Sequence, residues 1–426
     1  MKTILKTAMI ASTMLVAPAL QAFEMQAIDE NSAIDENLGM RLAPGFKASI
    51  FADGLGYLRH TAVSDEGVLY AGLYRPNEGM GIVAAKDTNG DGKADQIEYF
   101  GEGMQGTGVD IRNGYLYFST PTEVMRWKLN AGDVVPSGEK EVIITDMIPQ
   151  RSHRAKPFTF DNDGNIYVNI GAPSNACQEQ ARSPGSPGIM PCPQLENQGG
   201  IWRFSADQLG QTQAEHGHRY ATGVRNAMAL DWNDDANALF FASHGRDSLA
   251  DLWGYSVEDS AELPSEELHM ASDGSNHGWP YTFWDHQQNK RMKAPEYGGK
   301  QGDVDDNPDY KDPVLGFPGH WAPNDLLFVE GNGLPDGYQG GAFLAFHGSW
   351  NRAPLLQRGY NVVYIPFENG KATGDYTIVA DGFPGTFELK SPRDAKHRPM
   401  GLAEGPNGAL YLTSSVSGRI WRIEKE

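Results

Sequence analysis

The chain has 426 residues and a formal charge of −20, with 55 acidic against 35 basic side chains. A charge this negative argues against a nucleic-acid partner and against binding to an anionic membrane. Its 50 glycines and 26 prolines, with almost no long amphipathic helical pattern, indicate frequent turns and a mainly β chain.

The first 22 residues are typical of an export signal. Lys2 and Lys6 precede an apolar run at 8–19, and small residues lead to a cleavage site after Ala22. We therefore expect a signal peptide over 1–22 and a mature protein of the bacterial periplasm, with secretion beyond the cell left open. This run is too short for an anchor, and no later run is long enough to span a bilayer.

The stretch DTNGDGKADQIE at 87–98 fits an EF-hand calcium loop. The residues with ligand oxygens at the expected loop positions are Asp87, Asn89, Asp91, Asp95 and Glu98. The flanks GIVAAK and IEYF predict strands where an EF-hand needs helices. We expect a calcium-binding hairpin loop that stabilises the fold and is no calcium sensor; a plain turn without metal is the alternative.

One kind of segment recurs six times: a turn followed by a short alternating apolar strand with an aromatic residue. The aromatic residues are Tyr70, Tyr117, Tyr167, Phe240, Phe343 and Tyr411. A β-sandwich would not give one similar strand roughly every fifty to seventy residues. We therefore expect an all-β, six-bladed β-propeller in one domain at 41–426, after an irregular lead-in at 23–40 and with an insertion at about 249–318.

The two cysteines, Cys177 and Cys192, both lie in the Pro/Gly-rich segment ACQEQARSPGSPGIMPC. In an oxidising compartment we expect them to form a disulfide, and two free thiols are the alternative. On the chain-entropy account, closing a loop this short stabilises the fold by about 3 kcal/mol.

Basic side chains precede five of the six repeated strands. The groups are Arg59–His60, Ser152–Arg154, Arg225–Asn226, His320 and His397–Arg398. Because equivalent positions of successive blades converge on the central channel, we expect a basic ring at one channel mouth. Desolvated cations are costly without an anion, so the ring predicts a bound polyanionic small molecule. The alternative is that these residues pair with local acids such as Asp65, Asp231 and Asp394.

At these residues the chain resembles the soluble glucose/sorbosone dehydrogenases that use pyrroloquinoline quinone (PQQ), especially the sorbosone dehydrogenase-like branch. The matching segments run from about Arg41 to Ile423 and include SHRAKPFTFDNDGNIYVNIGAPSN, ATGVRNAMALDW, GSNHGWPY, HGSWNR and KHRPMGLAEGPNGALYLTSSVSGRIWRI. Each segment is weak alone, and their shared order is what is specific. That family has a six-bladed propeller with PQQ over the channel, which the repeats indicate independently.

The resemblance implies roles for residues around the channel. His153 matches the general base that takes the proton of the sugar C1 hydroxyl. Arg225 and Asn226 match the pair that contacts the quinone oxygens, where donors stabilise developing negative charge. Arg398 and the Asn351/Arg352 pair match the cationic contacts to the PQQ carboxylates.

A calcium ion beside the cofactor is also implied by the resemblance. The family takes backbone oxygens from the loop after the fourth repeated strand, which here assigns Gly245 and Arg246 as backbone ligands. Asp247 and Asp251 follow in the same loop as possible supporting carboxylates.

The leading hypothesis is therefore a periplasmic PQQ- and calcium-dependent dehydrogenase that oxidises an aldose or a sugar aldehyde. Its electrons would pass to an acceptor such as a periplasmic cytochrome or a membrane quinone. A calcium-dependent lactonase-like hydrolase and a non-catalytic ligand-binding propeller are the alternatives, since fold does not fix function. A lactonase needs carboxylate and Asn ligands that converge on one metal, and a basic ring argues against it.

Overall fold

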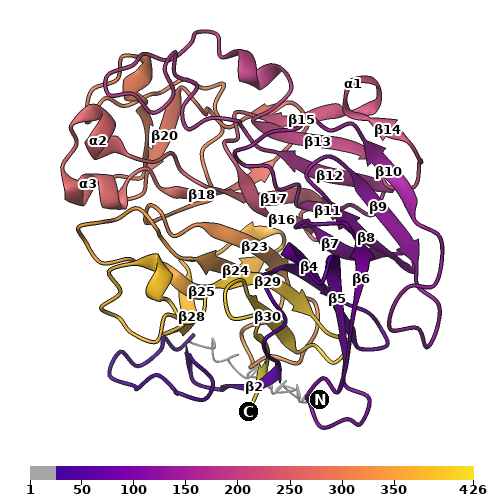
Figure 1. The fold of residues 1–426 in the computed structure, drawn as a ribbon. Coiled ribbons are helices and arrows are strands. Elements are labelled where there is room, and N and C mark those ends of the chain that lie inside the picture. The colour runs from indigo at the N-terminus through magenta and orange to yellow at the C-terminus, as the bar shows by residue number, and fades with distance from the viewer. Residues whose placement is uncertain (1–24) are drawn as a thin grey trace, which may run out of the picture.

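The structure is a computed structural model that describes residues 25–426, so the expected signal peptide at 1–22 lies outside the described residues. Within these residues, six sheets of four or five strands are arranged as a ring of blades (Figure 1), and two hairpins form separate two-stranded sheets. The expectation of an all-β, six-bladed propeller is confirmed. Within residues 25–426 no helix has both the length and the apolar character that crossing a membrane requires.

The six blades follow one another along the chain. Blade 1 consists of β3 (Leu58–Val63), β4 (Val68–Asn77), β5 (Met80–Lys86) and β6 (Gln96–Glu102). Blade 2 consists of β7 (Val109–Arg112), β8 (Tyr115–Ser119), β9 (Val124–Lys128), β10 (Glu141–Thr145) and β14 (Gln211–Thr212). Blade 3 consists of β11 (Phe158–Phe160), β12 (Asn165–Ile170), β13 (Gly200–Ser205), β15 (His218–Thr222) and β19 (Ser275–Asn276).

The second half of the ring follows the same plan. Blade 4 consists of β16 (Ala227–Asn233), β17 (Ala238–Ser243), β18 (Glu266–Ala271) and β22 (Leu315–Phe317). Blade 5 consists of β23 (Pro323–Phe328), β24 (Ala342–His347), β25 (Tyr360–Ile365), β28 (Thr377–Asp381) and β1 (Arg41–Leu42). Blade 6 consists of β29 (Pro399–Glu404), β30 (Leu410–Ser414), β31 (Ile420–Lys425) and β2 (Phe46–Ala52).

The first strand of each blade lines the central channel. Each of these strands contacts the first strands of both neighbouring blades, in the circular order β3, β7, β11, β16, β23 and β29. The six repeated aromatic residues all lie in the second strand of a blade, where their side chains are buried. Second-strand side chains pack between neighbouring blades, as Tyr70 of blade 1 does in one cluster with Phe118 of blade 2. The core is therefore divided among the seams of the ring.

The N-terminal part of the described chain closes this ring. Strand β2 pairs antiparallel with β31, with Ala48 opposite Ile423, and completes blade 6. Strand β1 pairs antiparallel with β28 and adds an outer strand to blade 5. Residues 25–40 consist of turns and one isolated bridge.

The insertion at about 249–318 does not form a separate unit. It supplies β18 and β22, which are the two outer strands of blade 4, and β19, which pairs with β15 of blade 3. The rest of it covers the ring beside blade 4 (Figure 1). This part consists of α2 (Leu249–Trp253), α3 (Val257–Glu262), the hairpin of β20 (Thr282–Asp285) and β21 (Lys290–Lys293), and η2 (Pro295–Tyr297). The remaining short elements are η1 (Pro193–Glu196), α1 (Gln213–His216), β26 (Phe367–Glu368), β27 (Lys371–Ala372) and η3 (Pro392–Asp394).

Candidate functional site

The candidate residues other than the 87–98 loop lie on one face of the ring. Strands within a blade alternate in direction, so the loop entering a first strand and the loop leaving a second strand lie on the same face. His153, Arg225 and Arg398 lie in loops that enter β11, β16 and β29. Arg246 and Asn351 lie in loops that leave β17 and β24. We call the face built by these two kinds of loop the mouth face.

The backbone of His153 is held in an unusual conformation. Its φ is 48°, in the left-handed region that costs a residue other than glycine about 1–3 kcal/mol. The Gln150 side chain secures this turn, because its Nε2 donates to the carbonyl oxygens of Ser152 and His153 at 2.8 Å and of Gly171 at 2.9 Å. Gln150 therefore positions the candidate base.

The imidazole of His153 has a defined tautomer. Its Nδ1 lies 2.6 Å from the backbone oxygen of Ala172, and a carbonyl oxygen can only accept, so Nδ1 carries the proton. In the neutral ring Nε2 is then the proton acceptor. Burial, followed by the nearby Arg225 guanidinium, lowers the pKa of His153 to about 3. The ring is therefore neutral at physiological pH, with Nε2 able to take a proton.

Asn226 lies beside this imidazole. A methyl group on Gly171 would lie 2.8 Å from the His153 Cβ and 3.0 Å from the Asn226 Oδ1, so both side chains pack closely on this glycine. The Asn226 Oδ1 accepts from Asn169 Nδ2 at 3.5 Å, and the Asn169 Oδ1 accepts from the backbone of Ala227 at 3.2 Å. This arrangement leaves the Nδ2 of Asn226 as a donor for a ligand.

Arg225 is the buried cation of an aspartate hub, which comprises Arg225, Asn175, Asp247, Arg182 and Asn351. Its Nη2 donates to Asp247 Oδ2 at 3.0 Å and to Asn175 Oδ1 at 3.1 Å. Asp247 also accepts from Arg182 Nη2 at 2.7 Å and from Asn351 Nδ2 at 2.9 Å. Burial raises the pKa of Asp247, but the Arg225 guanidinium and the other nearby cations outweigh burial and hold it well below its usual range. The hub thus joins loops of blades 3, 4 and 5 through one ionised carboxylate.

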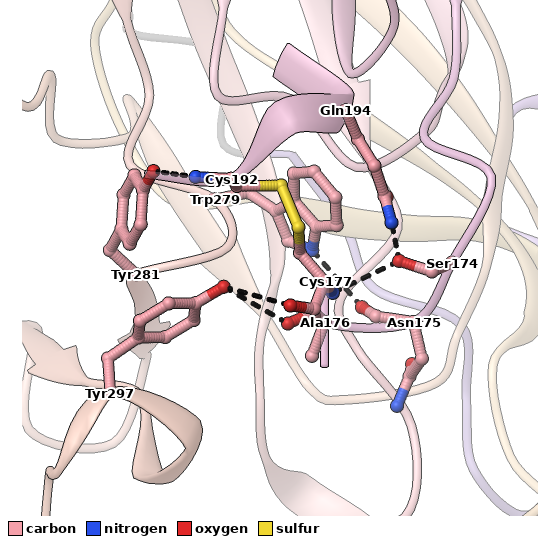
Figure 2. The surroundings of a disulfide bond; sticks show 9 residues. All are labelled: Ser174, Asn175, Ala176, Cys177, Cys192, Gln194, Trp279, Tyr281 and Tyr297. Atoms are coloured by element: carbon pink, nitrogen blue, oxygen red, sulfur yellow. Dashed lines mark hydrogen bonds between the residues drawn. A yellow bond between two sulfur atoms is a disulfide. The ribbon is translucent and has the colours of Figure 1, made fainter. Parts of the chain in front are cut away.

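The expected disulfide between Cys177 and Cys192 is present and lies next to the hub (Figure 2). Cys177 follows Asn175 by two residues, and the Trp279 Nε1 donates to the Asn175 backbone oxygen at 3.1 Å. The Tyr281 hydroxyl accepts from the Cys192 backbone at 2.8 Å. Trp279 is buried against the disulfide and packs in the core.

Replacing Cys177 and Cys192 together by serine is expected to lower the free energy of unfolding by about 3 kcal/mol. It should also loosen Asn175 and so weaken ligand binding at Arg225. Urea unfolding at pH 7 measures the first effect, and a titration with PQQ measures the second. An unchanged unfolding midpoint in the double variant would contradict a stabilising role for the bond.

Arg398 and Arg352 use most of their donors within the protein. The Arg398 Nε and Nη2 donate to the backbone oxygens of His347 at 2.9 Å and Gly348 at 2.5 Å, and no hydrogen bond within residues 25–426 uses its Nη1. Arg352 donates to Glu262 Oε1 of α3 at 2.7 Å, and its other donors bind backbone oxygens of α3 and of its own loop. Arg352 therefore holds the loop after β24 against α3, and its assignment to the cofactor stays a prediction.

Asp65, Asp231 and Asp394, which the sequence suggested as partners for the basic ring, form no ion pair with Arg225. Asp231 accepts from Thr159 Oγ1 at 3.2 Å and from the Phe328 backbone at 2.8 Å, and it lies within the channel. Burial raises its pKa to about 7. The carboxylate that pairs with Arg225 is Asp247, from the loop after β17.

The loop after β17 has the features that a calcium ion would require of Gly245 and Arg246. Within residues 25–426 no hydrogen bond reaches the backbone oxygen of either residue, and such oxygens are ligands that calcium prefers. The Gly245 backbone N–H donates to Glu266 Oε2 at 2.9 Å, which orients this peptide. The Arg246 side chain turns away and pairs with Glu296. These backbone atoms therefore fit the group that the sequence led us to expect.

The 87–98 loop is a hairpin loop between β5 and β6, so the expectation of flanking strands is confirmed. The Asp87 carboxylate accepts from the backbone of Gly90 at 2.7 Å and of Gly92 at 2.8 Å. The same kind of bond to loop backbone is made by Asn89, Asp91 and Asp95. Glu98 lies within β6 and accepts from the Gln96 side chain. The described residues contain no group of three or more His, Cys, Asp and Glu side chains arranged to hold a metal ion, and calcium in this loop stays a prediction.

These features define a six-bladed β-propeller that carries a neutral histidine and several cations at one mouth of its channel. The chain belongs to the TrAA12-like family, which its sequence matches over residues 40–426. The resemblance to PQQ-dependent sugar dehydrogenases is thereby confirmed at the level of the family.

Individual relatives are more distant. The pyrroloquinoline quinone-dependent pyranose dehydrogenase of Coprinopsis cinerea is 26% identical over 280 residues, which are 57% of this chain and 37% of the relative. An uncharacterized protein of Borreliella burgdorferi is 27% identical over 210 residues, 48% of each chain. The chain thus spans about half the length of the Borreliella burgdorferi protein and 37% of the length of the pyranose dehydrogenase.

Solved structures share the fold. The holo PQQ domain of the Coprinopsis cinerea pyranose dehydrogenase aligns with a TM-score of 0.72 at 18% identity, over 91% of this chain and 97% of that one. A family AA12 enzyme of Trichoderma reesei aligns with a TM-score of 0.73 at 20% identity, over 91% and 98%. The PQQ-bound aldose sugar dehydrogenase of Streptomyces coelicolor aligns with a TM-score of 0.54 at 18% identity, over 90% and 100%.

Proposed function

We propose that this protein is a periplasmic, PQQ- and calcium-dependent dehydrogenase that oxidises an aldose or a related sugar aldehyde, with His153 as general base. The observation that carries the proposal is the His153 imidazole, whose Nε2 is an unprotonated acceptor beside Asn226 and Arg225. Membership of the TrAA12-like family and the similarity to a pyrroloquinoline quinone-dependent pyranose dehydrogenase support the same reaction class. The export pattern at 1–22 supports the compartment.

The mouth face offers donors that suit a carboxylated quinone. Asn226 Nδ2 and Arg398 Nη1 would bind it, and the backbone oxygens of Gly245 and Arg246 would hold a calcium ion against it. When bound, the quinone supplies a two-electron acceptor for hydride and the calcium ion a Lewis acid.

The protein's own contribution is to move one proton. His153 Nε2 accepts the proton of the sugar C1 hydroxyl as the C1 hydrogen leaves with its electron pair. The Nδ1–H bond to the Ala172 oxygen holds the ring in place and stabilises the imidazolium that forms. Arg225 disfavours that imidazolium, so the proton passes on readily to solvent. Gln150 and Gly171 keep the imidazole at this position throughout.

Reconstitution tests the proposal directly. Purified mature protein is mixed with PQQ and calcium, and a panel of aldoses is offered together with an artificial dye as electron acceptor. Sugar-dependent dye reduction and saturable PQQ binding are expected. The absence of both would reject the proposal, and hydrolysis of a lactone without PQQ would favour the lactonase-like alternative. A periplasmic cytochrome or a membrane quinone as the natural acceptor is tested in the same assay by replacing the dye.

Calcium in the 87–98 loop would act on stability alone. The backbone N–H of Ala94 donates to the Phe51 oxygen of β2 at 2.8 Å, so the loop contacts the strand that closes the ring. We expect added calcium to raise the melting temperature of the wild type and to leave an Asp87→Ala/Asp91→Ala variant unchanged. Dye-linked activity per folded molecule should be equal in the two proteins. An equal calcium response in both melting temperatures would remove this loop as a calcium site.

A further inference from the structure

One small pocket of the mouth face is lined by cations and contains no acid. It lies between blades 1, 2 and 3, where Arg59, Arg154 and Lys156 surround it together with Tyr74 and Thr107. Its volume is about 30 Å³.

Lys156 is the buried member of this cluster. Its side chain is fully buried, and its ammonium makes one hydrogen bond, to the backbone oxygen of Arg154 at 3.1 Å. An ammonium has three N–H donors, so two are left without a partner among the described residues. Burial lowers the pKa of Lys156 to about 8. A lysine placed here is costly for folding unless a further acceptor completes its shell.

Arg59 and Arg154 lie against one tyrosine ring. Their guanidinium carbons are 5.5 and 5.2 Å from the centroid of Tyr74. The Arg59 Nε donates to Thr107 Oγ1 at 3.3 Å. Burial, opposed by Tyr74 and helped by Arg154, lowers the pKa of Arg59 to about 10. Within residues 25–426 no carboxylate lies at ion-pair distance from either guanidinium or from Lys156.

The fully buried arginines of this acidic chain do have acid partners. Arg41 binds Asp381 at 2.7 Å, and Arg126 binds Glu141 at 2.7 Å. With 55 acidic residues available, three cations that share a pocket without one are an exception. Mutual repulsion of desolvated cations is relieved when an anion binds between them.

We propose that Arg59, Arg154 and Lys156 form a carboxylate-binding subsite of the mouth face. The subsite takes one carboxylate of a ligand whose remaining atoms lie over the channel, and that carboxylate belongs either to PQQ or to an acidic sugar such as a uronate. This inference rests on the proposed function for the identity of the ligand. It moves the principal anion contacts from Arg352, whose donors are engaged by α3, to loops of blades 1 and 3.

The test compares Lys156→Met and Arg154→Gln with a matched control, Arg75→Gln. Arg75 is exposed and stacks on Tyr57 at 4.6 Å, much as Arg154 stacks on Tyr74. Affinity for PQQ is measured on the calcium-loaded protein by quenching of tryptophan fluorescence, and KM is measured for glucose and for glucuronate. Melting temperatures of the ligand-free proteins are recorded alongside.

If the carboxylate is that of PQQ, both test variants should bind PQQ at least about tenfold more weakly, because a charge-assisted hydrogen bond is lost. If it belongs to the substrate, PQQ affinity should hold while KM for glucuronate rises and KM for glucose does not. In either case ligand-free Lys156→Met should melt no lower than wild type, since an unpaired buried charge is removed. Unchanged PQQ affinity together with unchanged KM for glucuronate would overturn the subsite.

PQQ binding by the wild type alone shows whether the proposed function fails, separately from the subsite. If the wild type does not bind PQQ, thermal shifts with glucuronate and with glucose still test the pocket. Glucuronate should then stabilise the wild type and the Arg75→Gln control more than Lys156→Met. An equal shift in all three proteins would reject the subsite independently of the cofactor.

Discussion

Replacing His153 by alanine is expected to lower the turnover number by about 10²–10⁴-fold, the usual contribution of general acid–base catalysis. PQQ affinity should change little, because the imidazole makes its hydrogen bond with the Ala172 backbone and leaves Nε2 for the substrate. Steady-state dye reduction gives the turnover number, and fluorescence titration gives the affinity. Loss of PQQ binding with turnover intact at saturating PQQ would mean that His153 holds the cofactor and is not the base.

Two controls separate catalysis from folding. His218→Ala removes an exposed histidine that pairs with Asp273 on the outside of the ring, and it should be fully active. The pH profile is the second control. The folded pKa of His153, about 3, lies below the ordinary value of 6.5, so the neutral ring persists as pH falls through 6.5 and is lost only near pH 3. An acidic limb of kcat/KM near pH 6.5 that His153 sets would contradict its buried environment.

Replacing Asp247 by alanine is expected to lower the free energy of unfolding by about 3–5 kcal/mol, because it leaves the buried Arg225 without its counter-charge. Arg182 and Asn351 would lose the same acceptor. Urea unfolding of the ligand-free protein measures the change. Asp251→Ala, which removes an exposed acid of α2, is the matched control and should stay within about 0.5 kcal/mol.

The pH dependence of this difference has a definite sign. The folded pKa of Asp247 lies below the unfolded value near 3.9, so its stabilisation is complete above that pH and is lost as pH falls through the folded value. The difference in free energy of unfolding between the wild type and Asp247→Ala should therefore be constant from pH 5 to 7 and become smaller only in strong acid. An Asp247→Ala variant as stable as Asp251→Ala would show that the hub carries no net stability.

The fold could be predicted from sequence because each blade packs against its neighbours in the same way. A buried aromatic in the second strand of each blade, such as Tyr117 and Phe240, packs between blades and therefore recurs once per blade. The loops that carry the basic groups could be located for the same reason. Which atoms those groups bind could not be predicted, because Arg225 meets Asp247 and Arg352 meets Glu262 only after distant loops fold together.

The residues that sequence reasoning missed are those without a local pattern. Asn175 is central to the hub, yet its only signal is its place two residues before Cys177. Gln150 looks like a loop residue and shows its role only through three backbone oxygens. Lys156 lies in a segment that the resemblance covers, but nothing in the sequence indicates that its ammonium is buried.

The pairing of β2 with β31 has a consequence for how the molecule assembles. Strand β2, near residue 50, and β31, more than 360 residues later, share one ladder, so this sheet stays incomplete during synthesis until β31 has been made. Until then β30 presents an open edge that any extended segment can join. Once β2 pairs with β31, the hydrogen bonds between these two strands close the ring of blades. Closing a loop of this length costs only about 0.6 kcal/mol more in chain entropy than closing a loop of half the length. Pairing of a single strand can therefore close the ring.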